Sequence, residues 1–267
     1  MRILYLLALA FLLVFASCRA TERHEPSQRV LFVGNSLTYV GNVPAIYSAL
    51  AAANGRTVTS DMIVRGGATL AQRVADGSVA RALAAKKYST LVVQERGGDL
   101  TCSFGPDSCI QSRQAIQALA TLAGKHGVTV ILLGTYQPHP AASRNLIDKE
   151  SAAAAEAGIP YVEVSGKLQH LRSVAPDMTW FAADGMHPGK DLALLNAMLV
   201  YRALHGALPE PRPLTVTAPI YGSTSGLTET LRRADAPPPL PDTPGEVRYT
   251  SGTLKTLLDT IGSAVGG

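Results

Sequence analysis

The sequence predicts an α/β protein built as a three-layer α/β/α sandwich around a five-stranded parallel sheet. Between residues 30 and 208, short apolar runs rich in β-branched residues alternate with longer helical patterns. Each run is nearly continuous in apolar residues, as expected of strands buried on both faces of a parallel sheet. Strands that alternate with helices at this pitch need crossover helices, which then cover both faces of the sheet.

The expected elements follow one another in a regular order. The first strand, Val30–Gly34, is an apolar run that ends at a glycine, and the next helical pattern opens at Asn42-Val43-Pro44. The expected strand over 128–133 is strongly β-branched. The expected strands cover residues 30–34, 57–64, 88–95, 128–133 and 160–164. The expected helices cover about 43–54, 70–86, 109–126, 142–157 and 191–205.

Ser36 lies in the turn that follows the first expected strand. A serine in such a turn stands at the carboxyl edge of the sheet, near a helix N-terminus with free N–H groups. Open α/β sheets bind their ligands at this edge. Capping the following helix is the commoner role of a serine after a strand, so the turn alone leaves both roles open.

The segment Asp184-Gly185-Met186-His187-Pro188 supplies chemical partners for a serine. An Asp and a His three residues apart in a tight loop can hydrogen-bond without long-range positioning. The carboxylate then holds the imidazole in the tautomer whose other nitrogen is free to take a proton. Ser36, Asp184 and His187 together provide a nucleophile, an orienting group and a base.

These two segments resemble conserved blocks of one enzyme family. Gly34-Asn35-Ser36-Leu37 resembles the first block of the SGNH (GDSL-like) hydrolases, and Asp184-x-x-His187-Pro188 resembles the last. The two blocks bracket the chain from about residue 30 to residue 206. The resemblance implies a flavodoxin-like fold and ester hydrolysis through an acyl-enzyme on Ser36, with Asp184 and His187 as its catalytic partners. It implies neither a metal nor a cofactor.

The resemblance also suggests where an oxyanion would be stabilised. The Ser36 N–H is the first donor, and the glycine after the second strand is the second, where Gly67 fits better than Gly66; an ordinary turn glycine is the alternative. Many members carry Gly-x-Asn-Asp after the third strand, but this chain has Gln94 there. Some related esterases of acetylated sugars use a Gln, so we expect Gln94 to be the third donor, or else a helix-facing strand residue.

Three further residues are expected to contact the substrate. Glu95 and Arg96 follow Gln94 at the carboxyl edge, and His139 lies after the fourth strand. His139 has no adjacent Asp, so His187 remains the better base. A solvated loop histidine is the plainer interpretation of His139.

The N-terminus has the pattern of an export signal. Met1-Arg2 precedes an apolar run from Ile3 to Ala16, which is shorter than the roughly 20 residues that span a membrane. Its end resembles a bacterial lipobox with Cys18 as the acylated residue, although Phe15 replaces the usual aliphatic residue. Cleavage after Ala20 is the alternative. We expect a signal peptide over 1–20, a tether over 21–29, and an exported protein, periplasmic or at the cell surface, held to the membrane only by lipid on Cys18.

The two other cysteines are expected to form a disulfide. Cys102 and Cys109 flank a short loop, and an exported protein meets an oxidising compartment. Their C-x6-C spacing is not that of a metal site, and no histidine cluster accompanies it.

Composition narrows the classes of partner. The net charge of +4 is not gathered in any Lys/Arg run, so nucleic-acid binding is unsupported. Residues 209–267 form a proline-rich extension, expected to lie along the domain 30–208 and to end in a helix over 251–265.

The leading hypothesis is a secreted or lipid-anchored serine esterase that acts on a small-molecule or glycan ester, with removal of an O-acyl group from a carbohydrate as the favoured reaction. The alternative is a non-catalytic surface protein that binds carbohydrate or another ligand on the same fold, which the missing Gly-x-Asn-Asp block favours. Residues 34–38 lack the glycines of a phosphate cradle, so a nucleotide-binding module is a distant third. The oligomeric state stays open.

Overall fold

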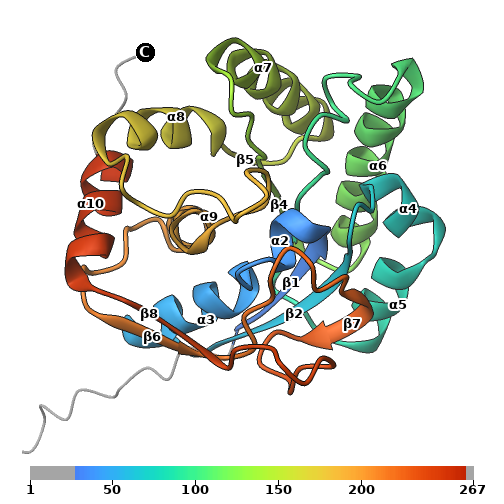
Figure 1. The fold of residues 1–267 in the computed structure, drawn as a ribbon. Helices are drawn as coiled ribbons and strands as arrows, with labels where there is room; N and C mark the ends of the chain where they lie inside the picture. The colour runs from blue at the N-terminus through green and yellow to red at the C-terminus, as the bar shows by residue number, and fades with distance from the viewer. Residues whose placement is uncertain (1–27, 263–267) are drawn as a thin grey trace, which may run out of the picture.

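A six-stranded sheet forms the middle layer of the protein (Figure 1). The structure is a computed structural model that describes residues 28–262, so the expected signal peptide, most of the tether and Cys18 lie outside the described residues. The strand order is β5-β4-β3-β1-β2-β7. The first five run parallel, as predicted, and β7 is antiparallel to β2. The strands are β1 (Gln28–Gly34), β2 (Val58–Arg65), β3 (Thr90–Val93), β4 (Thr129–Leu133), β5 (Tyr161–Val162) and β7 (Thr228–Arg233).

The central strand β1 shows why its apolar run is continuous. Val30 and Phe32 belong to the hydrophobic core on one face of the sheet, and Leu31 and Val33 to the core on the other. Successive side chains of a strand point to opposite faces, so a strand covered on both sides needs apolar residues at every position. All four side chains are fully buried.

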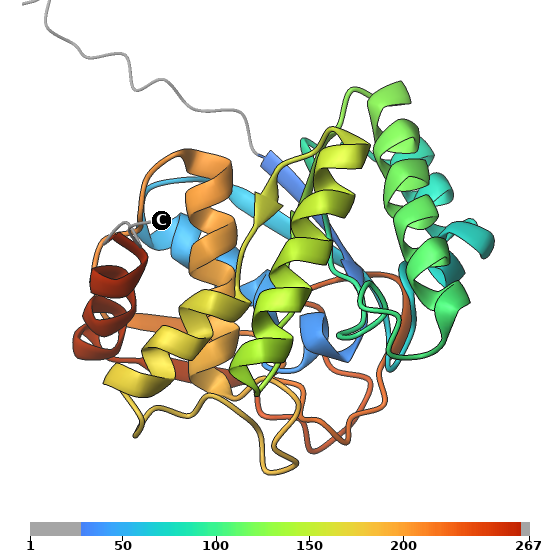
Figure 2. The same ribbon diagram turned by 90° about the horizontal axis from the view of Figure 1, so that it is seen from above.

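Helices cover both faces of the sheet (Figures 1 and 2). The core containing Phe32 is closed by α3 (Val43–Ala53), α8 (Ser165–Val174), α9 (Lys190–His205) and α10 (Ser251–Gly262). The core containing Leu31 is closed by α4 (Leu70–Ala75), α5 (Ser78–Ala85), α6 (Pro106–Lys125) and α7 (Pro140–Ala157). The helix expected over 70–86 is thus two helices, because Gly77 adopts a left-handed φ of 68° between them. Helix α8 was not expected.

The proline-rich extension packs along the sandwich as part of the same body. Its strand β7 extends the sheet beyond β2, and β6 (Leu214–Thr217) pairs with β8 (Glu246–Tyr249) in a separate two-stranded ribbon. Helix α10, where the sequence predicts a terminal helix, buries Leu254, Leu257 and Ile261. The extension therefore contributes apolar side chains to the core on the α3 and α9 side.

Asn42 fastens this extension to the start of α3. The residue is fully buried and has a left-handed φ of 56°. Its side-chain amide donates to the carbonyl oxygens of Pro219 (2.7 Å) and Ala234 (2.9 Å), while its oxygen accepts from the Ala45 N–H (3.2 Å). This position needs a left-handed backbone and a side chain that both donates and accepts hydrogen bonds. Asparagine meets both needs, because it tolerates the left-handed conformation and its amide carries a donor and an acceptor.

We predict that Asn42→Ala lowers the free energy of unfolding by about 3 kcal/mol, since it leaves buried carbonyl groups unpaired and strains the backbone. Asn42→Gly removes the same hydrogen bonds but accepts the left-handed conformation, so its loss should be smaller. Urea denaturation of both variants measures the two contributions. Variants within about 0.5 kcal/mol of the wild type would show that the extension does not depend on this residue.

Candidate active site

Ser36 is the first residue of the short helix α2 (Ser36–Tyr39), directly after β1. Asn35 caps this helix, because its side-chain oxygen accepts from the Leu37 N–H at 3.0 Å. A Cβ at Gly34 would collide with the Thr38 hydroxyl and lie 3.1 Å from the Gln94 carbonyl oxygen. Only glycine therefore allows the chain to turn so closely at the end of β1, and this turn places Ser36 at the carboxyl edge of the sheet.

Asp184 and His187 form the pair that their spacing predicts. The Asp184 Oδ2 lies 2.7 Å from His187 Nδ1, and Oδ1 accepts from the backbone N–H groups of Met186 and His187 at 2.9 Å each. These hydrogen bonds, that from the His187 N–H first, hold the pKa of Asp184 well below its usual range. An ionised Asp184 favours a proton on Nδ1, which leaves Nε2 of His187 as a base.

Ser36 and His187 line the same cavity, whose volume is about 420 Å³. Asn35, Gly67 and Arg96 also line it, and its remaining walls are largely apolar. The apolar side chains are those of Leu37, Phe104, Tyr136, Pro138 and Met186. The volume is that of a small-molecule site, and the mixture of apolar walls with a few polar groups is typical of one.

Tyr136 and Met186 are site residues that the sequence did not reveal. The buried Tyr136 hydroxyl donates to the Met186 carbonyl oxygen at 2.9 Å, which joins the loop after β4 to the loop that carries His187. Burial raises the pKa of Tyr136, so its hydroxyl remains a donor. The sequence offered one signal for each: Tyr136 follows the end of a strand, and Met186 comes directly before His187.

Two residues that line the cavity, Ser36 and Gly67, have backbone N–H groups that are free to donate. Within residues 28–262, neither the N–H of Ser36 nor that of Gly67 has a hydrogen-bond acceptor. Gly67 lines the cavity and Gly66 does not. The φ of Gly67 is 66°, and an added Cβ would meet nothing within 4 Å, so its backbone conformation is what favours glycine.

Gln94 lies at the end of β3, as predicted, but its side chain does not reach the cavity. Its side chain is buried, does not line the cavity, and donates from Nε2 to the Gly134 carbonyl oxygen at 3.1 Å. Its Oε1 accepts from the Thr38 hydroxyl at 2.8 Å. The prediction that Gln94 serves as an oxyanion donor is therefore corrected: its amide is used to join α2 to the end of β4.

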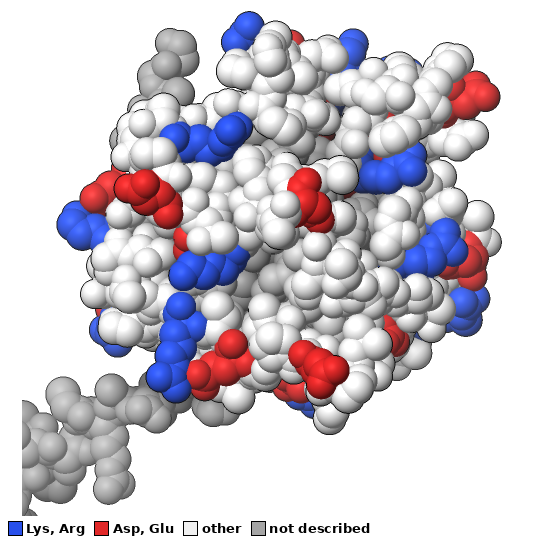
Figure 3. Space-filling view, viewed as in Figure 1, with Lys and Arg blue, Asp and Glu red and all other residues white. Residues whose placement is uncertain are grey.

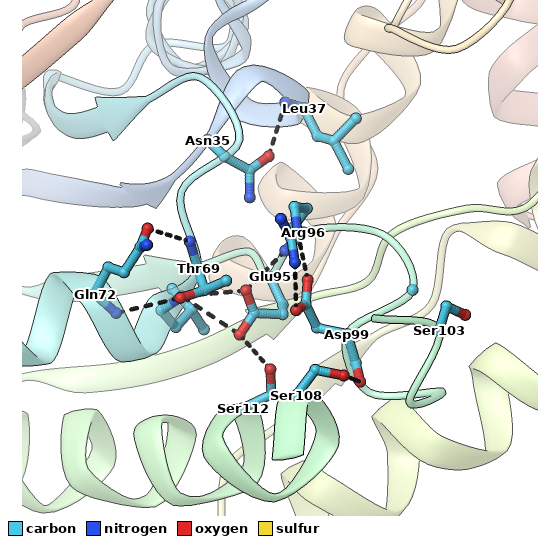
Figure 4. Close-up of polar contacts among 12 residues, drawn as sticks. Asn35, Leu37, Thr69, Gln72, Glu95, Arg96, Asp99, Ser103, Ser108 and Ser112 are labelled. Carbon is cyan, nitrogen blue, oxygen red and sulfur yellow. Dashed lines mark hydrogen bonds and ion pairs between the residues drawn. The ribbon is translucent and has the colours of Figure 1, made fainter. Parts of the chain in front are cut away.

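Glu95 also turns away from the cavity, against prediction. Its buried carboxylate accepts from the N–H of Leu70 (3.1 Å), the N–H of Arg96 (2.8 Å) and the hydroxyl of Ser112 (2.8 Å) (Figure 4). Burial raises its pKa to about 7 despite these donors. Glu95 thus joins the end of β3 to α4 and α6 instead of contacting substrate.

Arg96 does reach the cavity, as expected. Its guanidinium forms two hydrogen bonds to Asp99, at 2.8 and 2.9 Å, and lies 3.8 Å from the centre of the Phe104 ring. His139, in contrast, is an exposed residue that caps α7, with Nδ1 accepting from the Ala141 N–H at 3.2 Å. His139 is absent from the cavity wall, so its predicted substrate contact is not supported.

The predicted disulfide between Cys102 and Cys109 is present. It ties the loop after β3 to the first turn of α6. Phe104 lies within the closed loop, so the disulfide restrains the segment that carries this wall of the cavity.

Three further features were sought: charged patches on the surface, helices long enough to cross a membrane, and groups of metal-binding side chains. On the face drawn in Figure 3, basic and acidic side chains are interspersed over a largely uncharged surface. In the range 28–262, no helix has the length and apolar character needed to cross a membrane. The same described residues contain no group of three or more His, Cys, Asp or Glu side chains placed to hold a metal ion.

Comparison by sequence finds no relative: no family model matches the chain, and no curated protein matches it. Comparison by structure does. A protein from Slackia heliotrinireducens assigned to the SGNH hydrolases superposes with a TM-score of 0.55 at 23% identity, over 67% of this chain and 99% of that one.

Two esterases show the same likeness at lower identity. Axe2, an acetylxylan esterase from Geobacillus stearothermophilus solved as a catalytic mutant, has a TM-score of 0.51 at 14% identity, over 66% of this chain and 92% of its own. The psychrotrophic esterase EstA from Pseudoalteromonas sp., solved with monoethylphosphonate as inhibitor, has a TM-score of 0.51 at 14% identity, over 67% and 98%. The described chain therefore has the fold of the SGNH hydrolases, as its sequence blocks predict.

Proposed function

We propose that this protein is a serine hydrolase that cleaves esters through an acyl-enzyme on Ser36. One observation carries the proposal: Ser36 and His187, which is joined to Asp184 at 2.7 Å, come from distant parts of the chain to line a single cavity. A nucleophile, a base and an orienting carboxylate are the groups that acyl transfer requires.

In the proposed reaction, His187 Nε2 takes the proton of the Ser36 hydroxyl as Oγ attacks the ester carbonyl carbon. The C=O electron pair moves to the carbonyl oxygen, which becomes an oxyanion. When the intermediate collapses, the bond to the alkoxy oxygen breaks and His187 gives its proton to the leaving alcohol. Water, deprotonated by His187, then attacks the acyl-enzyme, and the acid and the free Ser36 hydroxyl are released.

Asn35 is our candidate for the third oxyanion donor, in place of Gln94, beside the N–H groups of Ser36 and Gly67. Its side-chain nitrogen has only a long contact, 3.5 Å to the Gln94 carbonyl oxygen, and Asn35 lines the cavity. A contact of that length holds the N–H weakly, so the donor is available to a stronger acceptor. The developing charge of an oxyanion is such an acceptor.

For the substrate, we propose an O-acyl group on a carbohydrate. The apolar walls of the 420 Å³ cavity suit a short acyl chain, and Axe2, which shares the fold, is an acetylxylan esterase. Export and lipidation of Cys18 belong to the same proposal, since extracellular glycans would then be within reach.

The alternative is a ligand-binding protein that has lost turnover. Its support is the absence of the Gly-x-Asn-Asp block, together with the structural use of Gln94. A binding protein has no need for the ionised Asp184 that orients His187, and this favours the enzyme.

We predict that Ser36→Ala and His187→Ala each lower kcat for p-nitrophenyl acetate by at least about 10³-fold, because each removes a member of the acyl-transfer machinery. Asp184→Asn should be milder, since it disturbs the orientation of the base and leaves the base in place. Steady-state kinetics on variants with wild-type circular dichroism provide the measurement. Turnover by Ser36→Ala close to that of the wild type would refute the mechanism and favour the binding protein.

We further predict that Asn35→Ala lowers kcat by about 10²-fold with little change in KM, as expected for a donor that acts mainly in the transition state. Gln94→Ala should instead lower the free energy of unfolding by about 1–3 kcal/mol, because it leaves Thr38 and Gly134 unpaired. Asn35→Ala also removes the cap of α2, so kcat, measured under conditions where urea denaturation shows both variants to be folded, separates the roles. The reverse pattern, with kcat lost in Gln94→Ala alone, would restore Gln94 as the donor.

A further inference from the structure

A second cleft adjoins the catalytic cavity. Its volume is about 450 Å³, and it lies between α4 and the first turns of α6. Arg96 and Phe104 line both spaces, so the two share one wall. Figure 4 shows polar side chains from the start of α4, the end of β3 and the start of α6 converging beside Arg96. Nothing in the proposed chemistry at Ser36 uses this second cleft.

The two residues of the shared wall, Arg96 and Phe104, are held in place by contacts with their neighbours. Asp99, itself buried, holds the Arg96 guanidinium through two hydrogen bonds, and the guanidinium lies against one face of the Phe104 ring. The Cys102–Cys109 disulfide closes the loop that carries Phe104. Phe104 is nevertheless 56% exposed. An aromatic ring that is held in place on one face and is exposed to solvent elsewhere can bind the apolar face of a ligand without rearranging.

The rest of the second cleft is polar and largely neutral. In the described part of the chain, the Asp107 carboxylate and the Gln111 amide, both exposed, make no hydrogen bond or ion pair. Arg96 is the cation of this lining, and Asp99 neutralises it. The uncommitted groups among these described residues are therefore the Asp107 carboxylate, the Gln111 amide and the side-chain NH2 of Gln72, whose oxygen alone is bonded. They suit the hydroxyl groups of a neutral ligand, and they disfavour an anionic group.

An acyl chain does not fit this chemistry, because it would cover polar groups without pairing them. A sugar unit does, because its hydroxyl groups can pair with an amide and a carboxylate while its C–H face rests on an aromatic ring. We infer that the second cleft binds a neutral sugar unit of an oligosaccharide whose acylated unit occupies the catalytic cavity. This inference rests on the proposed function and makes the substrate an oligomer instead of a single sugar.

The test compares kcat/KM on acetylated tetrasaccharides of β-1,4-linked xylose and glucose with kcat/KM on the acetylated monosaccharides. For the wild type, we expect at least a tenfold preference for one of the tetrasaccharides. The double variant Asp107→Ala/Gln111→Ala should lose about tenfold of this preference, chiefly through KM. Gln117→Ala, an exposed glutamine on the same helix but outside both spaces, is the matched control and should keep the preference.

Phe104→Ala extends the test to the shared wall and should also lower the preference by about tenfold. A wild type without any preference for a tetrasaccharide, or a double variant that keeps it, would overturn the subsite while hydrolysis of p-nitrophenyl acetate still supports the esterase. Failure of the wild type on every ester, p-nitrophenyl acetate included, would overturn the proposed function together with the subsite.

Discussion

The close approach of the chain to itself at Gly34 is the constraint on which the site depends. There is no room for a Cβ between this residue, the Thr38 hydroxyl and the Gln94 carbonyl group. The tight turn starts α2 directly at the end of β1 and leaves the Ser36 N–H without an acceptor among residues 28–262. The position of Ser36 is thus set by close packing at the centre of the sheet, where both neighbouring strands restrain β1.

Buried polar side chains hold the carboxyl edge together around this turn. Strand ends and helix starts leave N–H groups without partners, and buried groups of this kind must be paired. Glu95 pairs such groups between β3 and α4. Glu150 of α7 does the same between β4 and β5, accepting from the Thr135 N–H (2.8 Å) and the Tyr161 hydroxyl (2.7 Å). Both carboxyl groups are buried, and this burial raises the pKa of each to about 7.

The sequence predicted those features that local pattern determines. The buried strands follow from continuous apolar runs, and the Asp184–His187 pair follows from a spacing of three residues in one loop. The directions of Gln94 and Glu95 could not be predicted in this way. Both follow the end of β3, and their side chains turn toward partners from α2, α4, α6 and β4 that are distant in sequence. Strand β7 was missed for a related reason, because its pairing with β2 depends on a long return of the chain and not on its own sequence.

The central claim is that His187 activates Ser36 as a nucleophile. Peptide mapping by mass spectrometry after treatment with an ethyl fluorophosphonate probe tests it most directly, because the probe bonds to an activated serine hydroxyl. The account predicts a single adduct, on Ser36 among the serines of the protein, that forms far more slowly in His187→Ala. A folded protein that stays unlabelled at Ser36, or one labelled at Ser36 equally fast without His187, would contradict it.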